Sequence, residues 1–306
     1  IILGEKYKLQ KFEKANLGMS KNEIYYIKVG LKDPDITIEN IKKHLSLSKY
    51  KIIVINMDSK VHPAIITYLT NIQFTKNISV CTMEHFLEHR LHKCYIPFQN
   101  DNIDFLDNIR PYSAWQYFQK RCIDYFGVFW LFFFSWPVMI IAAVKIKLQS
   151  PGSVLFRQQR VGKNNQKFEC VKFRSMHENS EFFNRYTQED DPRIFPWGNT
   201  MRKTRIDELP QMLNILKGEM HLIGPRTEWD ELVRDYEKTI PYYNERHLVA
   251  PGITGWAQVN YPYGANIEDT RQKLMYDLYY IKYWSIWLEL KIVWKTAMTV
   301  IGRKGV

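Results

Sequence analysis

Residues 126–144 read FGVFWLFFFSWPVMIIAAV, an almost wholly apolar run that the rest of the fold must accommodate. Its length is close to the roughly 20 residues that an α-helix needs to cross the hydrocarbon core of a bilayer. Lys120 and Arg121 precede the run, and Lys145 and Lys147 follow it. Because basic residues favour the cytoplasmic side of a membrane, both ends of this helix are drawn toward the same side.

The middle of this run carries Ser135, Trp136 and Pro137. Proline removes one backbone hydrogen bond and kinks a helix, whereas a serine hydroxyl can bond a carbonyl that is freed. We therefore predict a re-entrant helix-break-helix over residues 112–148, with Ser135 and Pro137 at the break, that enters and leaves one leaflet. A kinked helix that spans the bilayer is the alternative.

Upstream of this helix, residues 1–107 alternate short β-branched runs with polar helical stretches. Residues 23–29, 51–57 and 78–83 are strand-like, and helices are expected between them. This alternation predicts a small Rossmann-like α/β unit around a parallel sheet. The sequence contains no GxGxxG, so dinucleotide binding is not expected in this unit.

Composition narrows the class of partner without choosing one. The 306 residues carry a formal net charge of +11, which favours an anionic partner such as nucleic acid, phospholipid headgroups or phosphorylated metabolites. The four cysteines show neither a CxxC pair nor zinc-site spacing, which indicates reduced thiols in a cytosolic environment. The chain begins at Ile1 without a Met or a basic leader, so we expect a piece of a longer protein.

A long amphipathic stretch occupies residues 269–301 near the C-terminus. Tyr and Trp recur in it at roughly helical spacing beside lysines, for example Trp287 and Trp294 beside Lys291 and Lys295. This pattern is typical of a helix that lies in the membrane interface. Packing of the aromatic side chains in a core explains it equally well.

The strongest local motif is DELPQ, which begins at Asp207 and is followed by Gly218, a residue suited to a helix end. Thr204 with Asp207 resembles a capping box, and Pro210 suits a first helical turn. The two carboxylates would then lie at a helix N-terminus, where the dipole favours the ionised form. There Asp207 can serve as a nucleophile and Glu208 as a metal ligand, with plain acidic capping as the alternative.

Basic residues surround this motif along the chain. Their guanidinium and ammonium groups can clamp a diphosphate, and carboxylates beside phosphates suit Mg²⁺, which we expect to bind at Asp207 and Glu208. Asp190 and Asp191 resemble the acidic metal-binding pair of many glycosyltransferases, although a turn before a proline explains them as well. The candidate substrate contacts are Lys172, Arg174, Arg202, Arg205 and Arg226, with Pro225 beside the last.

Seven motifs in a fixed order resemble the bacterial sugar transferase family of monotopic phosphoglycosyl transferases. The resemblance covers the chain from about residue 117 onward, and the preceding unit is similar to the accessory domain of the family's larger members. The motifs are KFR at 172–174, DDPR at 190–193, RKT at 202–204, DELPQ at 207–211, LIGPR at 222–226, PGITGWAQV at 251–259 and DLYYIK at 277–282.

The resemblance implies a reaction in which Asp207 attacks the phosphate that bears the sugar of a UDP-sugar, releases UMP and becomes a glycosyl-phosphoryl-aspartate. Undecaprenyl phosphate then accepts the phosphosugar, the first membrane step of exopolysaccharide, lipopolysaccharide O-antigen or capsule assembly. Glu208 matches the family's Mg²⁺ ligand, and Arg202 matches its essential arginine. Pro225 and Arg226 match the first part of its Pro-Arg-Pro motif.

Three positions depart from the family's pattern. Thr227 stands for the second proline of Pro-Arg-Pro, Ala250 stands where a basic residue is common, and Trp136 separates the serine and proline of the membrane break. These departures leave the sugar unassigned. Gln258 and Trp256 are candidates for shaping the nucleotide site, with packing as the alternative.

The expected fold is an α/β accessory unit at 1–107, the membrane helix at 112–148, and a mostly helical α+β catalytic domain at 149–306 with amphipathic interfacial helices. The expected place is the bacterial inner membrane, with the catalytic domain facing the cytoplasm. The expected partners are a UDP-sugar, undecaprenyl phosphate and phospholipid, without nucleic acid, and a homodimer is an open alternative to a monomer. The competing functions are a metal-dependent glycosyltransferase that uses Asp190 and Asp191, and a non-catalytic membrane scaffold for polysaccharide assembly.

Overall fold

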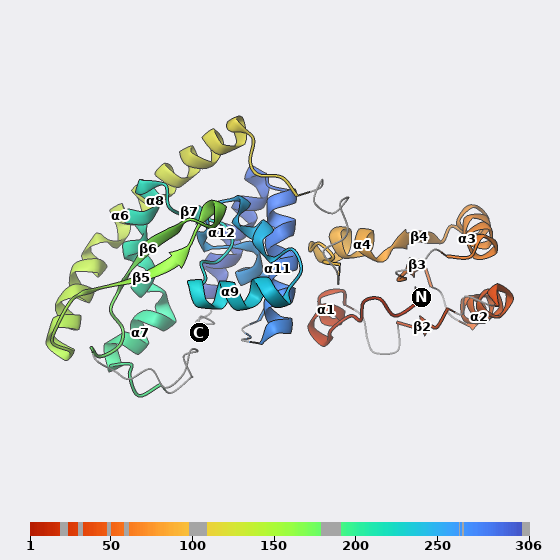
Figure 1. Cartoon of the computed structure of the whole chain (residues 1–306), viewed down its shortest axis with the longest axis horizontal. Helices are drawn as coiled ribbons and strands as arrows, with labels where there is room; N and C mark the ends of the chain where they lie inside the picture. The colour runs from red at the N-terminus through yellow and green to blue at the C-terminus, as the bar shows by residue number, and fades with distance from the viewer. Residues whose placement is uncertain are drawn as a thin grey trace. The chain divides into compact units, whose positions relative to one another are not determined.

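The computed structural model describes residues 1–18, 24–29, 33–47, 50–57, 61–97, 109–178, 191–262, 264 and 266–301 (Figure 1). These residues form two compact units, Ile1–Tyr95 and Ile96–Val306. Residues 98–108 lie outside the described residues, so the boundary expected near residue 107 stays a prediction.

The first unit is built on a parallel four-stranded sheet in the order β2-β1-β3-β4, as the alternating sequence pattern predicted. Ile53 of β3 packs in one core with Ile41, Ile65 and Leu69 from the flanking helices. Such β-branched side chains suit a strand that helices cover. The elements are β1 (Ile2–Leu3), α1 (Lys11–Asn16), β2 (Tyr26–Ile27), α2 (Pro34–Leu47), β3 (Ile52–Ile55), α3 (Pro63–Lys76), β4 (Ser79–Thr82), α4 (Met83–Phe86) and η1 (Leu87–Leu91).

The turn after β1 is held by the side chain of Asn56. Its Nδ2 donates to the carbonyls of Gly4 and Tyr7, and its Oδ1 accepts from the Tyr7 amide at 2.8 Å. Gly4 has a φ of 98°, which only glycine adopts without strain. In a dinucleotide-binding fold this turn carries the glycine-rich phosphate loop. Here Asn56 bonds the Gly4 carbonyl and both backbone groups of Tyr7 within the turn.

The second unit combines helices with two small sheets. Strands β5 and β6 pair antiparallel, with Leu155 opposite Phe173, and β7 pairs parallel with β8. The elements are α6 (Ala114–Gln149), β5 (Leu155–Val161), η2 (Lys163–Asn165), β6 (Lys167–Phe173), α7 (Pro196–Thr204), η3 (Ile206–Gln211), α8 (Met212–Lys217), β7 (His221–Ile223), α9 (Asp230–Thr239), η4 (Tyr243–Leu248), β8 (Gly252–Thr254), α10 (Trp256–Asn260), α11 (Ile267–Lys282) and α12 (Ile286–Ile301).

Helix α6 contains the apolar run and is long and apolar enough to cross a membrane. Only 11% of its most apolar 18-residue stretch is buried. Ser113 begins it with a capping box that Gln116 completes. The helix continues through Pro137 and bends along its length in Figure 1. The predicted interruption at Ser135 and Pro137 is therefore absent from α6, and the Ser135 hydroxyl has no hydrogen-bond partner among the described residues. Entry and exit through one leaflet stays a prediction.

The first part of α6 is fastened to the rest of the unit by buried polar side chains. Lys120 forms an ion pair with Glu289 of α12 at 2.6 Å. Asp124 accepts from the Leu222 amide at 2.9 Å and lies 2.6 Å from Nδ1 of His221. Because Lys120 is buried and paired, its charge supports the attachment of α6 and is a weak guide to membrane orientation, contrary to our use of it.

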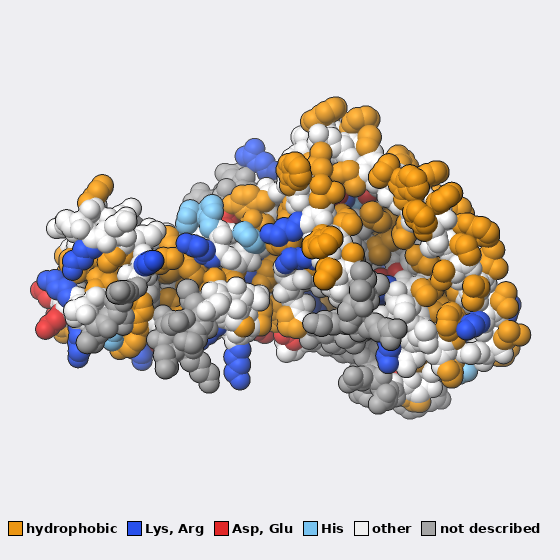
Figure 2. Space-filling model, turned by 180° about the vertical axis from the view of Figure 1, so that it is seen from behind, with side chains coloured by type: hydrophobic (Ala, Val, Ile, Leu, Met, Phe, Trp, Pro, Cys, Tyr) orange, Lys and Arg blue, Asp and Glu red, His pale blue; other side chains and the backbone are white. Residues whose placement is uncertain are grey.

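Hydrophobic side chains gather over the part of the surface that carries α6, as Figure 2 shows. Helix α12 also exposes apolar side chains, with Trp287 80% and Trp294 68% accessible. Helix α11, by contrast, buries Leu274, Tyr276 and Tyr280. The two helices of the amphipathic stretch therefore differ. Helix α11 packs in the core, whereas α12 leaves an apolar face exposed.

Candidate active site

The DELPQ motif lies on the 3-10 helix η3, which follows α7 after a single residue. Arg205 takes that position with a φ of 60°, so the chain turns sharply between the two helices. The capping box predicted for Thr204 is wrong, because Thr204 ends α7 and its hydroxyl donates to the Thr200 carbonyl at 2.7 Å. Gly218 has a φ of 83° and ends α8, as its position predicted.

Three cations from separate segments meet the carboxylate of Glu208. Lys172 of β6 lies 3.0 Å from Oε1, and Arg226, which follows β7, lies 3.5 Å from it. Arg205 lies 3.7 Å from the same oxygen. Burial favours the protonated acid, but these positive charges outweigh it and hold the pKa of Glu208 at about 2. Glu208 is therefore ionised at any physiological pH.

Asp207 lies beside this cluster in a different electrostatic state. Its side chain is 9% exposed, and its Oδ1 has no hydrogen-bond partner among the described residues. Burial and the adjacent charge of Glu208 raise the pKa of Asp207 to about 6, although Lys172, Arg202 and Arg205 oppose the shift. The expectation that a helix dipole favours the ionised form fails here, because burial dominates. Asp207 is still mainly ionised at pH 7.

Arg226 is placed by close contact between two glycine-containing loops. A Cβ atom on Gly252 would lie 2.1 Å from the Gly224 nitrogen, and one on Gly255 would lie 2.2 Å from the Gly224 oxygen. The Gly252 amide also donates to the Pro225 carbonyl at 2.9 Å. The backbones of the LIGPR and PGITG motifs therefore lie in direct contact, and this contact fixes the position of the Arg226 backbone.

The sequence did not single out Arg246, a buried residue whose side chain bonds the backbone of the segment that carries Arg226. Its guanidinium donates to the Arg226 carbonyl at 2.8 Å and to Asp277 at 2.9 Å. It also donates to the Tyr243 hydroxyl at 2.8 Å. Asp277 is the first residue of the DLYYIK motif. A buried carboxylate in a motif needs a cation as its partner, and that requirement is the signal that could have pointed to Arg246.

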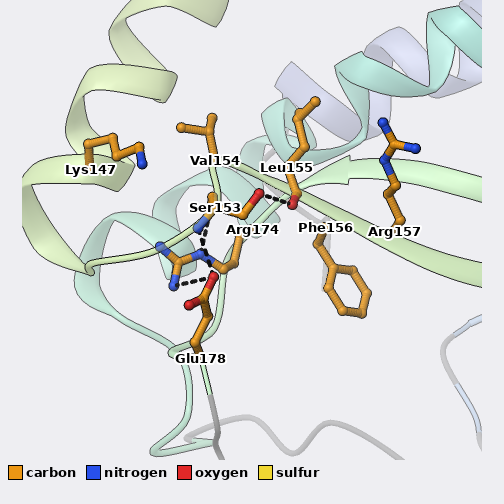
Figure 3. Close-up of a pocket in the computed structure, with 8 residues that line it drawn as sticks. All are labelled: Lys147, Ser153, Val154, Leu155, Phe156, Arg157, Arg174 and Glu178. Atoms are coloured by element: carbon orange, nitrogen blue, oxygen red, sulfur yellow. Dashed lines mark hydrogen bonds and ion pairs between the residues drawn. The ribbon is translucent and has the colours of Figure 1, made fainter.

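Arg174 does not reach the carboxylate pair and lines a separate cavity of about 640 Å³ (Figure 3). It donates to the Ser150 carbonyl at 2.7 Å and to the Ser153 carbonyl at 2.6 Å, so it braces the turn between α6 and β5. The cavity is lined by Lys147, Ser153, Val154, Leu155, Phe156, Arg157, Arg174 and Glu178. Neither Asp207 nor Glu208 belongs to this lining.

The remaining predicted site residues are Gln258, Asp190 and Asp191, and the two that the structure describes differ in their hydrogen-bond partners. Gln258 donates to the Ile253 carbonyl at 3.1 Å, and its buried Oε1 has no partner among the described residues. Asp191 is bound by Arg193 through its side chain at 2.8 and 2.5 Å, and these hydrogen bonds hold the pKa of Asp191 below its ordinary value. Asp190 lies outside the described residues, so the second member of that predicted metal pair has no placement.

Two carboxylates with one unbonded oxygen fit a divalent cation that also binds phosphate. Among the described residues, no three His, Cys, Asp or Glu side chains converge, so a metal site made of protein ligands alone is not found there. Mg²⁺ commonly binds through one or two carboxylates together with substrate phosphates. Oδ1 of Asp207 is available for such binding, so the pair suits Mg²⁺ together with a diphosphate.

Comparison with known proteins gives this arrangement a context. The sequence model of a family described as bacterial sugar transferase matches residues 115–303. The match includes every candidate substrate and metal residue named above, from Lys172 to Gln258.

Individual relatives agree with that match. A UDP-N-acetylgalactosamine-undecaprenyl-phosphate N-acetylgalactosaminephosphotransferase of Aeromonas hydrophila is 51% identical over 170 residues, which are 55% of this chain and 40% of the relative. A UDP-glucose:undecaprenyl-phosphate glucose-1-phosphate transferase of Xanthomonas campestris pv. campestris is 43% identical over 173 residues, 55% of this chain and 36% of the relative. The exopolysaccharide production protein PSS of Rhizobium leguminosarum bv. phaseoli is 36% identical over 191 residues, 60% of this chain and 96% of the relative. The chain thus spans about two fifths of the first two relatives.

Proposed function

The chain belongs to the bacterial sugar transferase family, and we propose that it transfers a sugar-1-phosphate from a UDP-sugar to undecaprenyl phosphate. The observation that carries this proposal is the cluster at η3. A buried carboxylate with an unbonded oxygen lies next to a carboxylate that three cations surround. A diphosphate needs that positive charge, and a nucleophile needs that free oxygen.

In the first step, a carboxylate oxygen of Asp207 forms a bond to the phosphorus that bears the sugar. The bond from that phosphorus to the oxygen bridging the two phosphates breaks, and the electron pair leaves with UMP. In the second step, an oxygen of undecaprenyl phosphate attacks the same phosphorus and releases the Asp207 carboxylate. Division into two steps lets one cationic pocket serve two polyanions in turn.

The residues around Asp207 have separate tasks in this proposal. Lys172, Arg205 and Arg226 supply the positive charge that draws the diphosphate and stabilises charge on the transferred phosphoryl group. Glu208 holds these cations in place. Mg²⁺, held by Asp207 and Glu208, would neutralise phosphate charge when bound. Arg202 adds positive charge near Asp207 from the last turn of α7.

The exposed apolar faces of α6 and α12 support an enzyme that works at a membrane. A lipid phosphate stays at the headgroup level, whereas a sugar nucleotide arrives from water, so the site must lie at their boundary. We propose that α6 anchors the chain in the bacterial inner membrane and that the second unit faces the cytoplasm. A re-entrant course of α6 would place both ends of the helix on that side.

A panel of UDP-sugars tests this function in nanodiscs that contain undecaprenyl phosphate, with UMP release as the signal. At least one donor should release UMP, and a radiolabel on its β-phosphate should appear in the lipid. A metal-dependent glycosyltransferase would leave that label with the nucleotide, which would refute the proposal. The ion pair between Asp191 and Arg193 gives that rival no support.

A further inference from the structure

Two lysines on α12 face the same buried indole. The Nζ of Lys291 lies 5.3 Å from the ring centroid of Trp256, and the Nζ of Lys295 lies 5.0 Å from it. The two lysines are four residues apart, so they occupy neighbouring turns on one side of the helix. Trp256 is almost fully buried and opens α10. Both ammonium groups therefore lie at the seam, the contact between α10 and α12.

The positive charge at this seam is not balanced within the described part of the chain. Neither Lys291 nor Lys295 forms an ion pair with any described carboxylate. Lys295 donates to the Asn260 Oδ1 at 2.5 Å, and that oxygen is neutral. Burial and the charge of Lys291 lower the pKa of Lys295. Like charges at this spacing repel, so an anion of two charges would stabilise the pair.

The apolar face of α12 that adjoins these lysines shows where such an anion would come from. Trp287, Leu290 and Trp294 are exposed on it, and none is covered by another described segment. Trp side chains of this kind favour the headgroup level of a bilayer. Lysines that flank the apolar face of an interfacial helix then lie at the depth of lipid phosphates.

The seam is also joined to the candidate active site through the backbone. Gly255 precedes α10 and packs against the carbonyl of Gly224, one residue before Pro225. The segment that carries Arg226 therefore starts next to the helix that carries Trp256.

We propose that Lys291, Lys295 and Trp256 form the binding site for the phosphate of the lipid acceptor. This inference rests on the proposed function and adds the place where the acceptor waits. A phosphate monoester carries about 1.5 to 2 negative charges at pH 7, which matches two ammonium groups. A phosphodiester headgroup carries a single charge and leaves one lysine unbalanced. The site thus selects polyprenyl phosphate over the surrounding phospholipid.

Native mass spectrometry of the full chain in detergent tests this site. The protein is titrated with a short-chain polyprenyl phosphate, the matching polyprenyl alcohol and phosphatidylglycerol. The variant K291Q/K295Q should bind the polyprenyl phosphate about tenfold or more weakly, because each lysine near a lipid surface contributes about 1 kcal/mol. Its binding of the uncharged alcohol should change little, and its binding of phosphatidylglycerol, which carries one negative charge, should weaken by clearly less than its binding of the monoester.

Two further variants keep the result interpretable. K291R/K295R retains both charges and should bind the monoester nearly as well as the unchanged chain. K145Q is a matched control, because Lys145 also lies over an indole, 4.1 Å from the Trp197 centroid, and no other described lysine lies over that ring. If K291Q/K295Q unfolds, the single variants K291Q and K295Q replace it, each with a smaller expected loss.

Equal affinity of the Gln variants and the unchanged chain for polyprenyl phosphate would overturn the proposal. An equal loss toward phosphatidylglycerol would also overturn it, because the seam would then be a general headgroup site. Release of UMP by the unchanged chain without any acceptor is measured separately. If the unchanged chain releases no UMP, the proposed function is contradicted. If it releases UMP but the Gln variants bind polyprenyl phosphate as well as the unchanged chain does, only the proposed lipid-phosphate site is contradicted.

Discussion

The side chains of Lys120 and Glu289 meet at 2.6 Å in a buried ion pair, although 169 residues separate them in the chain. Lys120 lies in the first part of α6 and Glu289 lies near the start of α12. The pair thus joins the two helices that expose apolar faces. Tyr280 and Trp284 donate to the same Glu289 oxygen at 2.6 and 2.8 Å, so the carboxylate is the centre of a network.

Loss of one partner from this pair should destabilise the second unit. Lys120→Met leaves Glu289 charged and without its cation, and breaking a buried pair in this way costs about 3–5 kcal/mol. The double variant K120M/E289Q keeps an acceptor for Tyr280 and Trp284 and removes the charge, so it should regain much of that loss. Thermal unfolding of the full chain in detergent ranks the variants. A double variant as unstable as Lys120→Met would show that the unpaired charge of Glu289 is not the cause, since Asp124 loses its 3.8 Å contact with Lys120 in both variants.

The rate at low donor concentration should rise with pH through about 6. Protonated Asp207 is neutral and cannot attack phosphorus, and its pKa of about 6 places the change in that range. Glu208 keeps its charge there, because its pKa is about 2. The measurement is kcat/KM for the UDP-sugar between pH 5 and pH 8, in about half-unit steps that resolve a single ionisation.

Glu208→Gln provides the matched variant for that profile. It removes the negative charge that helps to raise the pKa of Asp207, so the midpoint should move to lower pH while the maximal rate falls. An unmoved midpoint would mean that another group controls the rise.

Arg246 should act on catalysis through the position of Arg226. Arg246→Lys keeps the charge but loses the planar fork that bonds the Arg226 carbonyl and Asp277 together. We expect KM for the UDP-sugar to rise by about tenfold, with a smaller change in kcat, since a hydrogen bond from a charged group contributes roughly 1.5–3 kcal/mol. Arg234→Lys is the control, because Arg234 pairs with Asp230 on the surface. Equal KM values in the two variants would remove Arg246 from this role.

The parallel sheet of the first unit could be predicted because β-branched runs and helical stretches alternate along residues 1–95. The catalytic cluster was harder, because contacts between distant segments decide which cations take part. Lys172 and Arg174 are two residues apart, yet β6 ends at Phe173 and Arg174 turns to the Ser150 carbonyl instead. The capping box predicted for Thr204 does not form, because Arg205 adopts a positive φ and separates α7 from η3. No local sequence pattern predicts that conformation for an arginine. Arg246 was missed for the same reason, since the two partners that tie it to the site, Arg226 and Asp277, lie 20 and 31 residues away.

The central claim is that Asp207 becomes covalently attached to the phosphosugar. The direct measurement incubates the full chain with the best UDP-sugar and no acceptor, quenches the mixture and maps the peptides by mass spectrometry. We predict one UMP released per enzyme and one phosphosugar on the peptide that contains Asp207, with neither product from Asp207→Asn. UMP that appears only after undecaprenyl phosphate is added, or a phosphosugar attached to another residue, would contradict the account.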